Sequence, residues 1–111
     1  NDHAIAFLDI RPLTKGHTLV VPKQEVDYFF DLEDEGYTKL NLFAKRVAIG
    51  LKKVINCQRI ATAVIGLEVP HAHIHLIPIN SMSDVNFSNP KLNLSDDEMA
   101  HIATEIRSAV D

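Results

Sequence analysis

One segment constrains the fold of this chain more than any other: His71-Ala72-His73-Ile74-His75-Leu76-Ile77, in which histidines alternate with small or aliphatic residues. Successive side chains of a β-strand point to opposite faces of the sheet, whereas a helix repeats every 3.6 residues. The alternation therefore predicts a strand over residues 71–77. On such a strand the three histidines line one surface, and the residues between them face a hydrophobic core.

Three explanations of the histidine row compete. A solvated polar face fits one or two histidines, but not three in strict register with an aliphatic back face. A single metal ion cannot easily reach all three, since same-face neighbours on a strand lie about 6.5–7 Å apart and zinc binds nitrogen at about 2.0 Å. Two of them could bind a metal with ligands from elsewhere, although the sequence has no HExxH motif and no cysteine pair. Catalysis fits best, because a neutral imidazole suits proton transfer and nucleophilic attack near pH 7.

Apolar patterning outside the row predicts the rest of the fold. Short aliphatic or β-branched runs at residues 4–8, 17–21 and 59–67 predict strands. Apolar residues at steps of three and four across residues 31–55 predict one long helix. The capping-box pattern Ser95-Asp96-Asp97-Glu98 predicts a C-terminal helix. These elements indicate the α+β class, with a mainly antiparallel sheet, one long helix and a C-terminal helix.

Length, charge and cysteine content narrow the class of protein. A chain of 111 residues is long enough for a single domain with its own core. A formal net charge of −4 gives no basic surface for a nucleic-acid polymer. No apolar run approaches the roughly 20 residues that span a membrane, Cys57 is the single cysteine, and no signal peptide is visible. We therefore expect a soluble, cytoplasmic protein, in which residues 80–93 form a polar connection.

The histidine row resembles the His-φ-His-φ-His-φ-φ signature of the histidine triad (HIT) superfamily of nucleotide hydrolases and transferases, where φ is an apolar residue. A second stretch agrees with it: Ala6-Phe7-Leu8-Asp9-Ile10-Arg11-Pro12, followed by Lys15-Gly16-His17-Thr18-Leu19-Val20-Val21-Pro22-Lys23, is similar to the family's ribose-binding strand, turn and next strand. The resemblance covers about residues 6–79. Family members generally carry a helix and a strand before the ribose-binding strand. We therefore expect residues 1–111 to form a single HIT-like domain that can lack these two elements.

The resemblance implies an activity and a nucleophile. In the family, the middle histidine attacks the α-phosphorus of a nucleoside phosphoramidate or related nucleotide, and water then hydrolyses the nucleotidyl-histidine. This implies a nucleotide hydrolase or nucleotidyltransferase of the nucleoside phosphoramidase type, with His73 as nucleophile and His75 as hydrogen-bond donor to the phosphate. His71 and its carbonyl would orient His73, and His17 would lie behind the row. The alternative for His71 and His17 is a buried, hydrogen-bonded histidine without a direct role. No metal or cofactor is expected.

Asp9 is the candidate binding residue outside the row. A carboxylate accepts two hydrogen bonds, which suits the vicinal hydroxyls of a ribose. The alternative is a cap of the turn before Pro12. Leu8 and Ile10 would make apolar contacts with the base, and such contacts do not determine which base binds. The expected ligand is a small nucleotide, and a purine is the expected base. The resemblance also implies a homodimer.

The residues after Gly66 depart from the family pattern. Leu67 stands where the family has Gln, and Glu68 stands where it has a small or hydroxyl residue. Both are expected near the phosphate, where the carboxylate of Glu68 would disfavour highly charged substrates and favour amine leaving groups. The alternative is that Glu68 is solvated at the bend and has no effect on the substrate. A diadenosine polyphosphate hydrolase and a non-catalytic nucleotide-binding regulatory protein therefore remain alternatives to the phosphoramidase.

Overall fold

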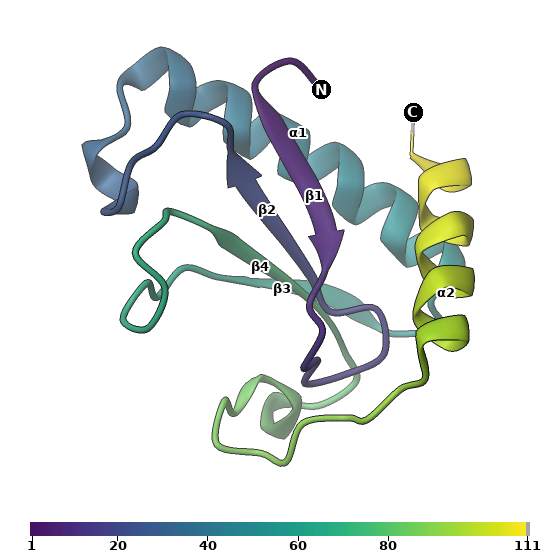
Figure 1. The fold of residues 1–111 in the computed structure, drawn as a ribbon. Coiled ribbons are helices and arrows are strands. Elements are labelled where there is room, and N and C mark those ends of the chain that lie inside the picture. The colour runs from purple at the N-terminus through teal and green to yellow at the C-terminus, as the bar shows by residue number, and fades with distance from the viewer. Residues whose placement is uncertain (111) are drawn as a thin grey trace.

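The computed structural model describes residues 1–110, whose centre is a four-stranded sheet in the order β1-β2-β4-β3 (Figure 1). All three strand pairings are antiparallel. The strands are β1 (Ala4–Leu8), β2 (Thr18–Pro22), β3 (Arg59–Ala63) and β4 (Ile74–Ile79). The helices are α1 (Asp34–Val54) and α2 (Asp96–Ala109), with short 3-10 turns η1 (Phe29–Asp31) and η2 (Met82–Val85). The predicted α+β class, with one long helix and a C-terminal helix, is confirmed.

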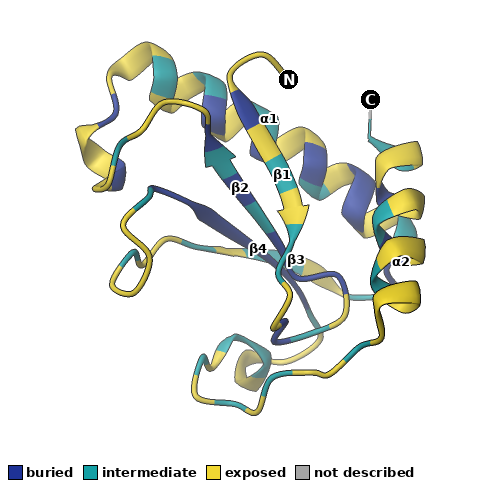
Figure 2. Cartoon of the chain, viewed as in Figure 1, coloured by how far each residue is buried: buried dark blue, intermediate teal, exposed yellow. Residues whose placement is uncertain are grey.

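Helix α1 covers one face of the sheet because its apolar residues fall on one side of the helix. Leu40, Val47 and Leu51 are buried there against a core that includes Ile74 and Leu76 of β4. Figure 2 shows buried positions, in dark blue, along α1 and on β4. Since neighbouring side chains on a strand point to opposite faces, His75 must project from the other face of the sheet. The core and the histidine row are thus separated by the sheet itself.

Helix α2 begins at the capping box that the sequence predicts. The backbone N–H of Glu98 donates to Oγ of Ser95 at 3.1 Å, and the N–H of Ser95 reaches Oε1 of Glu98 at 3.4 Å. Ile102 and Ile106 then bury one face of α2 in the core. Neither helix of residues 1–110 is long and apolar enough to cross a membrane.

The histidine strand begins later than the alternation predicts. β4 begins at Ile74, so His71 and His73 lie in the segment before it, and the prediction of a strand over 71–77 is wrong at its start. The reason lies in β2, which ends at Pro22 and has no N–H there to continue the ladder. The carbonyl of Pro22 instead accepts a hydrogen bond from Nε2 of His71 at 2.9 Å. The carbonyl of His71 is likewise occupied by the side chain of His73.

Two other boundaries differ from the prediction. β3 ends at Ala63 rather than at residue 67, because Ala63 pairs with His75 near the start of β4 and no partner strand extends beyond it. α1 begins at Asp34 rather than at residue 31, because Phe29–Asp31 forms the separate turn η1 and buries Phe29. Both shifts depend on contacts that a local pattern does not encode.

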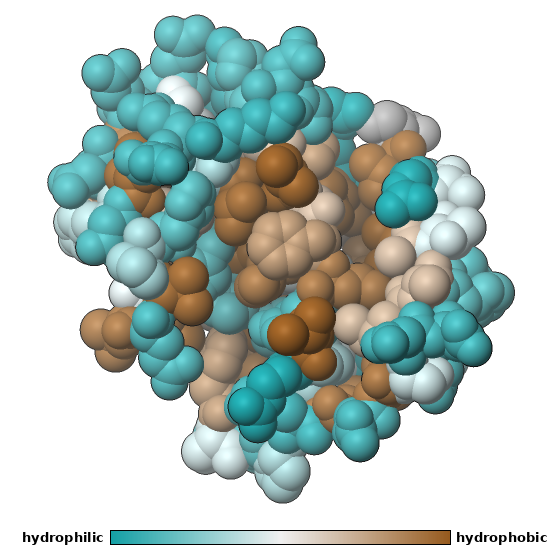
Figure 3. Space-filling view, in the orientation of Figure 1, coloured by the Kyte–Doolittle hydropathy of each residue, from teal (hydrophilic) through white to brown (hydrophobic). Residues whose placement is uncertain are grey.

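The surface over β1 is apolar. Ile5 and Phe7 are 48% and 47% exposed on this edge strand. Figure 3 shows a brown, apolar area at the centre of the face on which β1 lies in Figure 1. The side chains of β1 thus contribute to the surface as well as to the core.

We predict that Gly16→Ala lowers the free energy of unfolding by about 2–4 kcal/mol, combining the strain of a positive φ with overpacking. Gly16 has a φ of +91°, and an added Cβ would lie 2.8 Å from Cγ1 of Ile55. Gly66→Ala is the matched control, because its φ is +73° but nothing lies within 4 Å of an added Cβ. Urea unfolding should show a clearly smaller loss for Gly66→Ala, about 1–2 kcal/mol. Equal losses would contradict the close packing of Gly16.

Candidate active site

His17, His73 and His75 line a pocket of about 730 Å³ that also includes residues from the bend after β3 and the loop after β4. This volume lies within the usual range for sites that bind small molecules. The pocket brings together most of the predicted site residues: Asp9, Ile10, His17, Leu67, Glu68, His73 and His75.

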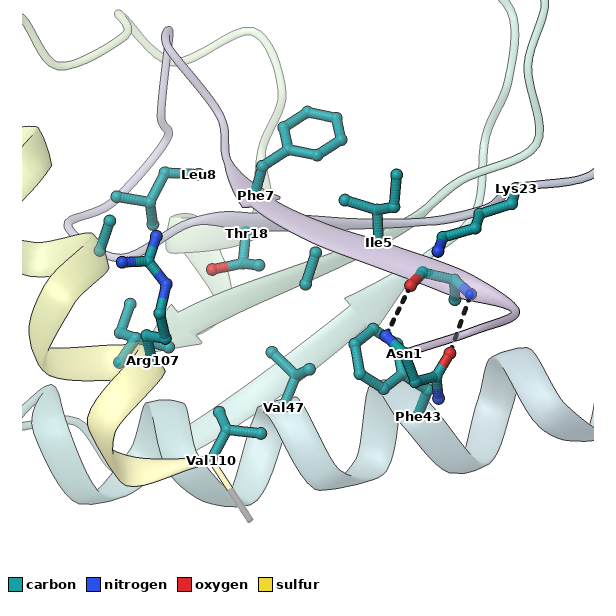
Figure 4. A pocket seen from close by; sticks show the side chains of 14 residues that line it. Asn1, Ile5, Phe7, Leu8, Thr18, Lys23, Phe43, Val47, Arg107 and Val110 are labelled. Atoms are coloured by element: carbon teal, nitrogen blue, oxygen red, sulfur yellow. Dashed lines mark hydrogen bonds between the residues drawn. The ribbon is translucent and has the colours of Figure 1, made fainter.

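Two predicted site residues lie elsewhere. His71 does not line the pocket, and its ring is held by the carbonyl of Pro22. Leu8, predicted to contact the base, lines a separate groove of about 540 Å³ between β1 and the two helices. Figure 4 shows this groove, with Leu8 from β1, Val47 from α1 and Val110 after α2. No histidine is among the residues that line it.

The turn between β1 and β2 fixes both the position and the protonation of His17. Its ring is 1% exposed, and the backbone N–H of Leu13 donates to its Nδ1 at 3.0 Å. A neutral imidazole carries one proton, so accepting at Nδ1 places that proton on Nε2. Nε2 of His17 lies 2.9 Å from Nδ1 of His75 and therefore donates to it. By the same argument, neutral His75 carries its proton on Nε2.

His73 has the opposite arrangement. Its Nδ1 lies 2.7 Å from the carbonyl oxygen of His71. A carbonyl can only accept, so Nδ1 carries the proton and Nε2 keeps a lone pair. Every fully buried side-chain nitrogen and oxygen in residues 1–110 has a hydrogen-bond partner, whereas Nε2 of His73 and of His75 has none within that part of the chain. Both atoms must therefore be accessible from the pocket, one as an acceptor and one as a donor.

Burial keeps the His17–His75 pair uncharged. The pKa of His75 is lowered to about 4, mainly by burial and further by the neighbouring rings of His17 and His73, while Asp9 opposes the shift. Burial also lowers the pKa of His17, against the effect of Asp9 and with that of Lys91. The tautomers deduced from the hydrogen bonds are thus those of a neutral pair at pH 7.

Asp9 caps a turn and also faces the histidines. Its Oδ1 accepts from the backbone N–H of Arg11 at 2.9 Å, so the turn-cap alternative is seen in the structure. Its Oδ2 lies 3.8 Å from Nε2 of His17, on the pocket side. One carboxylate oxygen thus remains to accept from a ligand.

The ligand atoms of Asp9, His17 and His75 lie within 4.8 Å of one another, close enough to hold a cation. Coordination by His17 would need a lone pair on Nε2, so its proton would have to move to Nδ1. The N–H of Leu13 already points at Nδ1, and two hydrogens would then face each other. The backbone therefore favours a hydrogen-bonded pair over a metal centre.

The loop after β4 also contributes to the pocket, although the sequence predicts only a polar connection over residues 80–93. Phe87 and Lys91 of this loop line the pocket. They are the single aromatic residue and the single cation of that segment, which was the available signal.

Comparison with known proteins places these features in a family. The family model described as HIT domain matches residues 1–82. A HIT-like protein of Borreliella burgdorferi is 32% identical, over 96% of this chain and 82% of its own length. An adenosine 5'-monophosphoramidase of Schizosaccharomyces pombe is 34% identical over the same shares of the two chains. For a HIT-like protein of Mycoplasma genitalium, 37% identical, the match spans 70% of this chain and only 59% of the relative.

Solved structures agree. A HIT-like protein of Bartonella henselae, described as involved in cell-cycle regulation and solved with an unknown ligand, has a TM-score of 0.83 and 25% identity. The match covers 99% of this chain and 82% of that one. The NitFhit protein of Caenorhabditis elegans has a TM-score of 0.82 and 30% identity, over 99% of this chain and 26% of that one. With its histidine arrangement, its fold and the family model in agreement, this chain belongs to the HIT (histidine triad) family.

Proposed function

We propose that this protein is a nucleotide hydrolase or nucleotidyltransferase that cleaves nucleoside phosphoramidates through a nucleotidyl-histidine on His73. The observation that carries the proposal is the 2.7 Å contact between Nδ1 of His73 and the carbonyl of His71. It leaves Nε2 of His73 as an unprotonated nucleophile in the pocket. Two yeast relatives, 38% and 34% identical, are named adenosine 5'-monophosphoramidases and support this reaction.

The reaction has two steps at one phosphorus atom. Nε2 of His73 forms a bond to the α-phosphorus, and the bond from phosphorus to the leaving amine breaks as the amine takes up a proton from the pocket water. Water then attacks the phosphorus, the bond to Nε2 breaks, and a nucleoside monophosphate is released. If an alcohol or a second phosphate replaces water, the same intermediate makes the protein a transferase.

His75 supplies the donor for the charge that develops on the phosphate. Its Nε2–H is fixed by the hydrogen bond that Nδ1 accepts from His17 at 2.9 Å. A donor held in place before the reaction stabilises the transition state without a cost of reorientation. Because the pair is neutral at pH 7, the donor carries no net charge of its own.

The remaining pocket residues bind the rest of the substrate. Oδ2 of Asp9 accepts from the ribose hydroxyls, and Ile10, which is 86% exposed at the pocket, covers a purine base. Leu67 and Glu68 lie in the bend after β3, on another wall of the pocket. An exposed carboxylate there favours a cationic or neutral amine over a polyphosphate chain as leaving group. Turnover of a fluorogenic adenosine phosphoramidate, measured beside diadenosine polyphosphates, tests this substrate class. Faster turnover of the dinucleotides would support the polyphosphate hydrolase instead, and none of either would support a binding protein.

We predict that His73→Ala slows turnover of the phosphoramidate on the order of 10³-fold or more, with a modest change in nucleotide affinity. Acid quench during turnover should trap labelled nucleotide on the wild-type chain and none on the variant. His101→Ala is the control, because His101 lies exposed on α2 and pairs with Glu105. Wild-type turnover by His73→Ala would refute the proposed nucleophile.

We predict that stability falls as the pH is lowered from about 6.5 to about 4. A histidine with a folded pKa of about 4 binds fewer protons than the unfolded chain across this range, so unfolding is favoured as the pH falls. His75 alone accounts for up to about 3 kcal/mol by pH 4. Urea unfolding of the wild type and of His75→Gln at several pH values measures the difference. The same pH slope in both proteins would show that His75 does not resist protonation.

We also propose a two-fold homodimer. Strand β3 is an edge of the sheet, and Leu42 and Ile49, 58% and 49% exposed, lie on the side of α1 away from its core. Light scattering at micromolar concentration should give twice the mass of one chain. Leu42→Glu should give a monomer, whereas Met82→Glu, at a side chain that is 83% exposed on the loop after β4, should remain a dimer. A monomeric wild type would refute the pairing.

A further inference from the structure

Phe87 covers the hydrogen-bonded histidine pair. Its ring centroid lies 4.9 Å from that of His75 at an interplanar angle of 73°, and 6.3 Å from that of His17 at 79°. Both are edge-to-face contacts, the geometry that aromatic rings prefer. One half-buried ring thus touches the two imidazoles whose protonation the backbone has fixed.

Lys91 holds the loop that carries Phe87. Its Nζ donates to the carbonyl of Phe87 at 2.6 Å and to that of Asn89 at 3.2 Å. The N–H of Leu92 donates to the carbonyl of Pro12 at 2.8 Å, which ties the loop to the turn that carries His17. In Figure 1 the green chain after β4 passes beside that turn. The loop is therefore anchored by the side chain of Lys91 and by the backbone of Leu92.

We propose that residues 86–91 form a positioning loop, which holds Phe87 against His17 and His75 and preserves their hydrogen bond as the support of the donor beside His73. The role of this loop in catalysis rests on the proposed function, whereas its effect on the hydrogen bond between His17 and His75 does not. Phe87 and Lys91 are positioning residues, because they act through the histidine pair.

The physical reason is the exclusion of water. If His75 gained a proton on Nδ1, that atom and Nε2 of His17 would both carry hydrogens, and their 2.9 Å hydrogen bond would be lost. An apolar ring over the pair raises the cost of that charge, since water cannot solvate it. Burial is the largest cause that lowers the pKa of His75. Removing the ring of Phe87 removes part of that burial.

Charged and titratable groups surround His75 on several elements. Asp9 at the end of β1 favours its protonated form, whereas His17 and His73 disfavour it. Lys91 acts on His17 in the same sense as burial. Arg11 and Glu68 line the same pocket. Asp9 raises the pKa of both His17 and His75, whereas burial lowers it. By adding to that burial, Phe87 counteracts the effect of Asp9, the carboxylate proposed to bind ribose.

The test is a pH titration of the histidine rings by NMR on the ligand-free, isotope-labelled chain. We expect the wild-type His75 ring to titrate near pH 4. Phe87→Ala should raise that midpoint by about one unit or more, and Phe87→Leu, which keeps an apolar cover, should raise it by less than half as much. Lys91→Met should raise the midpoints of His17 and His75, because it removes both the positive charge and the anchor of the loop. Phe30→Ala is the matched control, since Phe30 is 67% exposed and its ring packs on Tyr28, Phe29 and Tyr37.

Unchanged midpoints in Phe87→Ala and in Lys91→Met would overturn the inference, as would a shift of the same size in Phe30→Ala. A rise in KM for Phe87→Ala with an unchanged titration of His75 would also overturn it, because the ring would then act as a substrate contact. The titration needs no substrate. A wild type that turns over no phosphoramidate would therefore refute the proposed function and leave the inference to be decided by the midpoints.

Discussion

The hydrogen bond from Nε2 of His17 to Nδ1 of His75 is the interaction on which the rest of the site depends. Its direction is set by a main-chain group, the N–H of Leu13, which occupies Nδ1 of His17. That N–H lies in a turn whose path requires a positive φ at Gly16. A conformational constraint in the chain between two strands thus decides where the proton of His75 resides. In the same way, the carbonyl of His71 places the proton of His73 on Nδ1, and the carbonyl of Pro22 places the proton of His71 on Nε2.

The two faces of the sheet have different roles: one packs in the hydrophobic core, and the other carries the candidate site. One face of β4 packs on α1 through Ile74 and Leu76, and the opposite face presents His75 to the pocket. The end of β2 at Pro22 releases the chain before β4 from the ladder. That release lets His73 bond to the carbonyl two residues before it, which a residue within a regular strand could not do. The wrong prediction of the strand start therefore falls at His73, the proposed nucleophile, where the chain leaves regular structure.

The sequence predicts this fold where the determining signals are local. Residues 4–8 coincide with β1, and Ser95 and Glu98 cap α2 as their spacing requires, because periodicity and capping involve neighbours in the chain. The start of β4 depends on Pro22, and the cover of His75 depends on Phe87. These are contacts between distant segments that no short pattern records. His17 and His75, separated by 58 positions, could be paired only through the family resemblance.

The two edges of the sheet in residues 1–110 differ in their chemistry. In residues 1–110, β1 pairs with β2 on one side only, and its five residues contain no charged residue and no proline. Natural sheets usually protect such edges with charges, prolines or a covering segment. The other edge strand, β3, begins with the charged residue Arg59. Within residues 1–110, Ala4–Leu8 therefore has the edge chemistry that suits pairing with a further strand, which would lie beside the groove that Leu8 lines.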